Sequence, residues 1–380
     1  MSQLNCDEHL DSSGGNSAKI NGVTPTIYNT AGKNLVFGGD FATNPWQRGT
    51  TFTNPANGTY TTDRFIIIRS DDAAVDIKKT AFTTDLTLSK GVNTEYCLHA
   101  DVTTADSSIS AAQFYAIAQY IEGLNIAPLG YGKSGTRYQV FAFLHQHTKT
   151  GTYCVAFRNG AANRSYVAEY TQDVSDAVEL AIITVPVDTG GTWLYDEGAI
   201  GLRVTFALAC GTDKQTTAGS WQTGNYIATS SQVNALDSTS NNFKIALIQL
   251  EPGQSQTIFE SLPRGAVIRQ CQRYYEKTFP ISTPPSHGTS LGGGGEFRVN
   301  CNSQEPVVAW RFKVEKCQAP TCAIYGFTGR TAGQWTTGAN DSANARVLWP
   351  NTSSVILDNS GIALSSGNWH CHAIADAELY

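Results

Sequence analysis

The sequence predicts an all-β protein, in which an antiparallel jelly-roll β-sandwich is followed by one linking helix and a second, smaller β domain. Short runs of alternating apolar and polar residues recur along most of the 380 residues, and turns rich in glycine and asparagine separate them. Alternation with a period of two indicates half-buried strands. Because most of these runs have no helical pattern between them, a sandwich or jelly roll is favoured over alternating strand–helix units.

The individual elements follow from the same patterns. Nine strands are expected in the first two thirds of the chain, at 64–69, 96–102, 113–121, 137–145, 152–158, 165–171, 178–187, 200–210 and 242–251. An amphipathic helix is expected over 264–276, since its apolar residues fall on one face, Pro263 precedes it and Pro280 follows. Strand patterning then returns at 296–300, 307–316, 322–327, 345–349, 354–356 and 369–379.

These elements divide the chain into three predicted parts. Residues 1–32 are polar and without periodicity, which indicates an extended N-terminal docking arm. Residues 33–262 are expected to form the jelly-roll domain. Residues 263–380 are expected to contain the linking helix and the C-terminal β domain.

Charge and composition exclude several classes of function. The net charge is −6, with no basic stripe, so nucleic acid is not an expected partner. No apolar run approaches the ~20 residues that a membrane span needs, so membrane insertion is not expected. The first residues include Asp7, Glu8 and Asp11, where an export signal would have a basic start and an apolar core. The nine cysteines are odd in number and include no CxxC pair, which predicts free buried thiols and folding in a reducing cytoplasm.

Several short segments resemble the jelly-roll domains of fibre-type virion proteins from phages and prophages. The resemblance extends over about 34–277 and includes, beyond that, only the end of the chain; residues 1–32 match nothing in it. The segments that carry it are 34–41, 46–52, 62–65, 118–125, 150–154, 163–167, 248–253, 271–277 and 375–379.

The resemblance implies a virion protein. The expected role is that of a tail fibre or receptor-binding fibre, commonly trimeric, which binds neighbouring virion proteins through its arm and contacts host surface polysaccharide. A trimer would strengthen weak sugar binding by multivalency. Two alternatives remain open: a head or collar fibre or decoration protein without a receptor role, and a polysaccharide-degrading virion enzyme.

The family's jelly roll is similar to carbohydrate-binding modules, which often hold a structural calcium near the first and last strands. On that resemblance Asp40 and Glu251 are the candidate calcium ligands. Asp40 could instead close a turn, and Glu251 could be a solvated strand end.

Sugar recognition needs an exposed aromatic platform together with amide and hydroxyl groups. Trp193, Trp221 and Trp335 lie in loops rich in glycine and threonine, and we expect these three to be exposed and to bind glycan. The alternative is that such a tryptophan closes one end of the sandwich and is buried.

Other motifs are weaker. Residues 127–134 fit the phosphate-loop consensus, but a strand pattern follows where a helix is required, so a turn is expected. His145 and His147 could chelate a metal, although solvated strand-end histidines are favoured. His370 and His372 repeat this spacing, and three copies of the chain would bring six imidazoles together if a trimer axis ran there, yet a packed C-terminal strand is the expected role of His372. No pair of carboxylates or nucleophile motif stands out, so catalysis is not expected.

Overall fold

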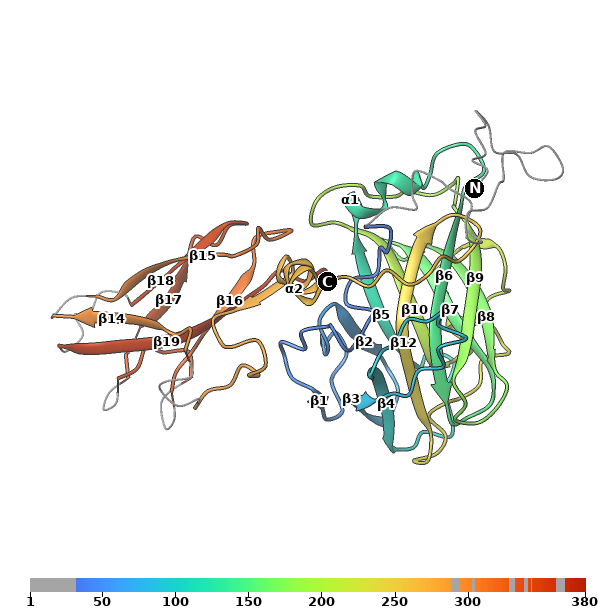
Figure 1. Cartoon of the computed structure of the whole chain (residues 1–380), viewed down its shortest axis with the longest axis horizontal. Coiled ribbons are helices and arrows are strands. Elements are labelled where there is room, and N and C mark those ends of the chain that lie inside the picture. Colours follow the sequence, from blue (N-terminus) through green and yellow to red (C-terminus); the bar gives the residue numbers. More distant parts are fainter. Residues whose placement is uncertain are drawn as a thin grey trace, which may run out of the picture.

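The computed structural model describes residues 32–288, 294–302, 305–327, 332–337, 341–342, 344–359 and 366–380. The fold is all-β, as predicted: a large antiparallel sandwich is joined through a short helix to a smaller β region (Figure 1). The expected N-terminal arm lies outside the described residues except for Gly32. Among the helices that are described, none has the length and apolar character to cross a membrane.

Two six-stranded sheets form the sandwich. Sheet A has the order β1 (Thr51–Phe52), β3 (Ala74–Ala81), β4 (Tyr96–Thr104), β12 (Asn242–Pro252), β6 (Tyr138–His147) and β9 (Glu179–Pro186). Sheet B has the order β11 (Trp221–Thr223), β8 (Arg164–Gln172), β7 (Gly151–Asn159), β10 (Ile200–Cys210), β5 (Phe114–Glu122) and β2 (Phe65–Arg69). All strand pairs within both sheets are antiparallel, and strands that are distant in sequence lie side by side, as in a jelly roll.

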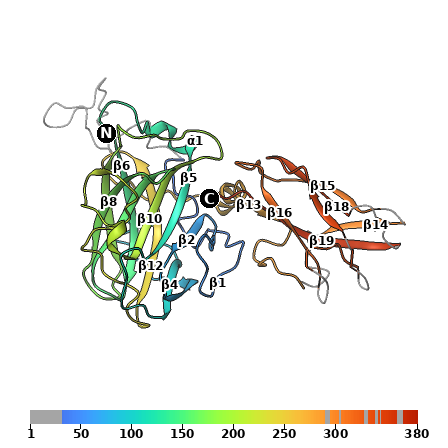
Figure 2. The same cartoon turned by 180° about the vertical axis from the view of Figure 1, so that it is seen from behind.

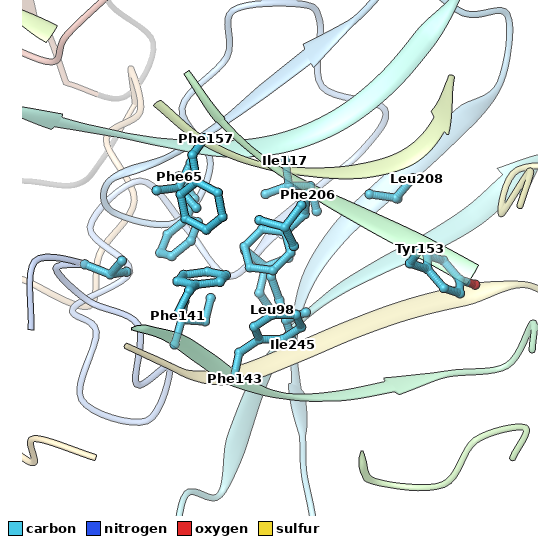
Figure 3. Packing of buried hydrophobic residues seen from close by; sticks show 14 of the residues in the cluster. Phe65, Leu98, Ile117, Phe141, Phe143, Tyr153, Phe157, Phe206, Leu208 and Ile245 are labelled. Carbon is cyan, nitrogen blue, oxygen red and sulfur yellow. The ribbon is translucent and has the colours of Figure 1, made fainter. Parts of the chain in front are cut away.

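The core lies between the two sheets and consists of the residues at alternate strand positions. Aromatic rings from both sheets meet there (Figure 3): Phe141 of sheet A packs edge-on against Phe157 of sheet B, with ring centroids 5.4 Å apart. Phe143 packs in the same way against Phe206, at 5.0 Å. These four side chains are buried, and each such ring contributes about 1.5–3 kcal/mol by burial alone.

The nine strands predicted for the sandwich all form, with ends shifted by one or two residues. The short strands β1 and β11 and the longer β3 were not predicted, although Val75 and Ile77 of β3 alternate with polar residues and are fully buried. Helix α2 (Arg264–Gln272) ends before the predicted boundary, because Tyr275 begins strand β13 (Tyr275–Lys277) and pairs with Asp376. Two shorter helices, α1 (Gly123–Ile126) and the 3-10 turn Ala127–Leu129, follow β5.

The C-terminal region contains two small sheets. One has the order β13, β19 (Gly367–Asp376), β14 (Phe297–Cys301), with β16 (Thr321–Tyr325) also paired to β19. The other has the order β15 (Val307–Arg311), β18 (Ser354–Asn359), β17 (Ala345–Leu348). Trp310, Trp335 and Trp369 form the centre of its own hydrophobic core.

The chain end lies where the two regions meet, beside α2, in both views (Figures 1 and 2). There Tyr274 and Leu379 pack against Tyr120 of the sandwich in a buried apolar cluster. Arg64 forms an ion pair with Glu378, and both side chains are almost completely buried. The guanidinium of Arg64 also lies 3.4 Å from the centre of the Tyr274 ring. The last residues of the chain therefore join the C-terminal region to the sandwich.

His145 and His147 are not the solvated strand-end residues that the sequence suggested. Strand β6 continues to residue 147, so both rings fall on its core face and are 1% and 0% exposed. His145 Nδ1 is 2.9 Å from the side-chain oxygen of Gln172, and His147 Nε2 is 3.0 Å from the Tyr170 hydroxyl. Burial lowers the pKa of both histidines, so they are neutral core residues.

The thiols agree with the sequence prediction. Each cysteine in the described part of the chain is free, and all of these except the half-buried Cys322 are buried. Cys6 belongs to the segment that is not described. His372, on β19, is buried as expected: its ring stacks on Phe279 with centroids 4.0 Å apart.

Candidate functional site

Two of the three tryptophans predicted to bind glycan meet at one end of the sandwich. Trp193 stacks on Tyr131 with ring centroids 4.0 Å apart, and Trp221 packs edge-on against Trp193 at 5.5 Å. The indole nitrogen of Trp193 donates to the carbonyl of Gly190, and that of Trp221 donates to the carbonyl of Pro186. The aromatic cluster closes this end of the sandwich and fixes the loop that contains Tyr131.

The predicted exposure of these tryptophans was wrong in two cases. Trp193 is 8% exposed and Trp335 is fully buried, whereas Trp221 is half-buried. Trp193 lies beneath Tyr131, and Trp335 fills the C-terminal core, where its indole nitrogen donates to the Asp358 carbonyl. Glycine and threonine indicated loops correctly at Trp193 and Trp335, whereas Trp221 begins strand β11; loops that fold over a core bury their aromatic residues.

The loop over the aromatic cluster connects α1 with β6 and includes the phosphate-loop-like segment 127–134. Gly130, Gly132 and Gly135 have positive φ angles of 66°, 67° and 104°, and strand β6 follows, which confirms the predicted turn. Arg137 holds this turn together by donating to the carbonyls of Gly130 and Lys133 at 2.6 and 2.9 Å. Because a strand and not a helix follows the segment, no helix begins there to direct its amides at a phosphate.

This loop forms one wall of an open depression of about 290 Å³, lined by residues 128–129, 136–138 and 252–254. The start of β6 contributes Tyr138, and the end of β12 contributes Pro252; the two strands are paired here, and the Gly253 amide donates to the Tyr138 carbonyl. The depression therefore lies at the end of sheet A, where two central strands hold its floor in place.

The lining offers both apolar and polar groups. Tyr138 is half-buried, and no other aromatic ring of the described residues packs against it. Pro128, Leu129 and Pro252 make the remainder of the surface mainly apolar, while the exposed Thr136 and Gln254 offer a hydroxyl and an amide that bind no side chain in the described structure. An unstacked ring beside free hydroxyl and amide groups has the chemistry of a saccharide subsite. Neither Tyr138 nor Gln254 was recognised from the sequence, because Tyr138 appeared as an ordinary strand residue.

The proposed calcium ligands are each engaged by protein donors. The carboxylate of Asp40 accepts from the Ala42 amide at 3.1 Å and from the hydroxyls of Thr43 and Thr94 at 2.9 and 2.7 Å. Asp40 therefore closes a turn, which was the alternative interpretation.

Glu251 is 2% exposed, not a solvated strand end, and its carboxylate accepts from the amide and hydroxyl of Thr257 at 2.8 and 2.7 Å. Within the described residues, no three side chains of His, Cys, Asp or Glu come together as a group that could hold a metal. Calcium binding by Asp40 and Glu251 thus remains a prediction from the resemblance.

One aromatic residue not singled out from the sequence is more exposed than any of the predicted three. Trp349 follows β17, is 74% exposed, and has a positive φ of 48°. Positive φ is uncommon for bulky residues. The sequence signal was the Pro350-Asn351 turn directly after it.

Comparison with known proteins finds structural likeness only. No protein-family profile and no curated protein sequence matches the chain. Similar structures include the enzymatically active domain of tailspike protein 4 from bacteriophage CBA120, at 12% identity and a TM-score of 0.27, covering 58% of this chain and 21% of that one.

Carbohydrate-binding modules are also among the similar structures. The family 11 module of a Clostridium thermocellum cellulosomal cellulase has 10% identity and a TM-score of 0.27, covering 54% of this chain and 97% of the module. The N-terminal cellulose-binding domain of a Cellulomonas fimi glucanase has 9% identity and a TM-score of 0.25, covering 51% and 90%. The chain spans only about a fifth of the tailspike domain. Identities and TM-scores are low, so none of these proteins indicates what this chain binds.

Proposed function

We propose that this protein is a fibre-type virion protein of a phage or prophage and that its sandwich binds host surface glycan in the depression beside Tyr138. The virion role is supported by the sequence segments that resemble such fibres. The glycan role is supported by one observation above all: Tyr138, against which no other described aromatic ring packs, lines a mainly apolar depression of about 290 Å³. A homotrimer and contact with neighbouring virion proteins through residues 1–32 are parts of the same proposal.

The geometry suggests how a sugar would bind. A pyranose ring has an apolar C–H face that packs on an aromatic ring, and Tyr138 would provide this platform. The hydroxyls around the ring would bind the Thr136 hydroxyl and the Gln254 amide at the edge of the depression. Since the Arg137 guanidinium is occupied by loop carbonyls, it would keep the wall in position and leave recognition to its neighbours. No bond is made or broken in this role.

A glycan array on the full chain, followed by calorimetric titration of the selected glycan, tests the proposal. Tyr138→Ala is expected to weaken binding about tenfold, or about 1.4 kcal/mol, whereas Tyr138→Phe keeps the platform and much of the affinity. Tyr96→Ala is the matched control, because Tyr96 also begins a strand of sheet A and is 36% exposed, but does not line the depression.

Two results would contradict the glycan role. If the array selects no glycan, the protein is better explained as a head or collar fibre without a receptor function. Equal affinity of Tyr138→Ala and wild type would place the sugar elsewhere. Light scattering tests the trimer separately: a mass of one chain in solution would contradict it.

A further inference from the structure

Three polar side chains and a tyrosine form a continuous row across the outer face of sheet B. Arg203 of β10 lies between Arg158 of β7 and Tyr120 of β5 in the strand register, and Arg158 in turn faces Ser165 of β8. The guanidinium of Arg203 lies 4.2 Å from the centre of the Tyr120 ring. We call this set of four residues the arginine row.

The two arginines of the row have no acidic partner in the described structure. Arg158 donates to the side-chain oxygens of Asn225 and Thr205 at 2.5 and 2.9 Å, and Arg203 donates twice to the Gly160 carbonyl at 3.1 and 2.9 Å. All of these acceptors are neutral. The Nε atom of Arg158 is buried and has no hydrogen-bond partner, and the residue is only 5% exposed.

Several other arginines, unlike these two and Arg137, are neutralised by a carboxylate. Arg64 pairs with Glu378, Arg164 pairs with Asp188 at 2.7 Å, and Arg273 pairs with Glu122 at 2.8 Å. A buried positive charge without a counter-charge costs free energy, and a second like charge directly across the ladder adds to that cost. Accordingly, burial and the neighbouring Arg203 lower the pKa of Arg158 to about 10.

We infer that the arginine row binds an oxyanionic group, a carboxylate or sulfate, which supplies the missing negative charge. Arg203 is half-buried and is therefore accessible to a ligand from solvent. Guanidinium groups bind carboxylate and sulfate oxygens through paired N–H donors, and the bond is stronger when water is partly excluded. Tyr120 is itself buried against Tyr274 and Leu379, so it flanks Arg203 and leaves the Arg203 guanidinium as the accessible part of the row.

The group could be carried by an acidic saccharide or be a free ion. The saccharide source rests on the proposed glycan-binding function, whereas the free ion does not. The row is composed of residues that do not line the Tyr138 depression, so it is a second site. A glycan with uronate or sulfate substituents would then engage both sites or either one.

Calorimetric titration of the full chain with trigalacturonate, and separately with inorganic sulfate, tests this inference. Arg203→Gln is expected to weaken binding of the anion at least tenfold. Arg311→Gln, an exposed arginine on β15, is the control and is expected to bind as wild type does. Circular dichroism and the unfolding midpoint establish that both variants are folded.

The outcomes separate the two sources and the two sites. Tighter binding of trigalacturonate than of sulfate assigns the anion to a saccharide, and the reverse order assigns it to a free ion; either order, with loss in Arg203→Gln, supports the site. Tyr138→Ala should leave anion binding unchanged, so this inference and the proposed function fail independently. The inference would be overturned if neither probe bound at a concentration about twenty times a Kd of about 1 mM. Equal binding of the anion by Arg203→Gln and wild type would also overturn it.

Discussion

The junction between the sandwich and the C-terminal region depends on Glu378, and replacing this residue by glutamine tests how the two regions are held together. Its side chain is completely buried, Arg64 donates to one carboxylate oxygen, and Arg48 lies 3.3 Å from the other. Glu378→Gln keeps the size of the side chain but leaves Arg64, itself 1% exposed, without a full counter-charge. Removing one partner of a buried ion pair costs about 3–5 kcal/mol.

The assay is urea denaturation of the full chain, with the unfolding midpoint and the slope measured for each variant. Glu197→Gln is the matched control at the same junction: it removes an ion pair with Arg273, but Glu197 is 51% exposed. An exposed pair contributes about 0–1 kcal/mol, so this control should be close to wild type. A double change, Arg64→Met with Glu378→Leu, should recover much of the loss, because it removes the unpaired charge and keeps the packing.

The reasoning would be refuted if Glu378→Gln and Glu197→Gln lowered the free energy of unfolding by the same small amount. In that case the apolar contacts of Leu379 and Tyr274 alone would hold the junction.

Three further predictions follow from burial. Because burial lowers the pKa of His147, the folded state loses stability as the pH falls below the unfolded pKa of about 6.5. The urea midpoint of the wild type should therefore decrease from pH 8 to pH 5, and that of His147→Phe should decrease less. An equal decrease in the two proteins would contradict the neutral, buried state of His147. Trp335→Ala should lower the free energy of unfolding by about 3–5 kcal/mol, whereas replacing the exposed Trp349 by alanine should change it little. Equal decreases of the melting temperature in the two variants would contradict the burial of Trp335 and the exposure of Trp349. Burial raises the pKa of the Cys154 thiol to about 11, so an alkylating reagent at pH 8 should modify this thiol only when the protein unfolds. Peptide mass spectrometry detects the modification, and rapid labelling of Cys154 in the native protein would contradict the prediction.

The strands were predictable because their signal is local. In β3, Val75 and Ile77 are buried and alternate with less buried Asp76 and Lys78, and this period of two is visible in the sequence. The helix boundary was less predictable, since Tyr275 continues the apolar face of α2 but pairs in a strand with Asp376, about a hundred residues further along the chain. Pairing between distant segments has no signature in a local pattern.

The candidate sites were harder to predict than the fold. Trp193 was assigned to a loop correctly, whereas Trp221 begins strand β11, and the burial of both side chains depends on packing against Tyr131. Tyr138 became a candidate only when the structure showed its ring unstacked beside Pro252. The pairing of Arg158 with Arg203 requires the register of two strands that are some forty residues apart. In each case the decisive contact joins residues distant in sequence.

The most direct test of glycan binding by the sandwich is a crystal structure of the full chain with the glycan that the array selects. The proposal predicts a sugar ring packed face-on against Tyr138, with its hydroxyls bound to Thr136 and Gln254. Density for the sugar against Trp349 or elsewhere on the protein, with the depression holding only water, would contradict it.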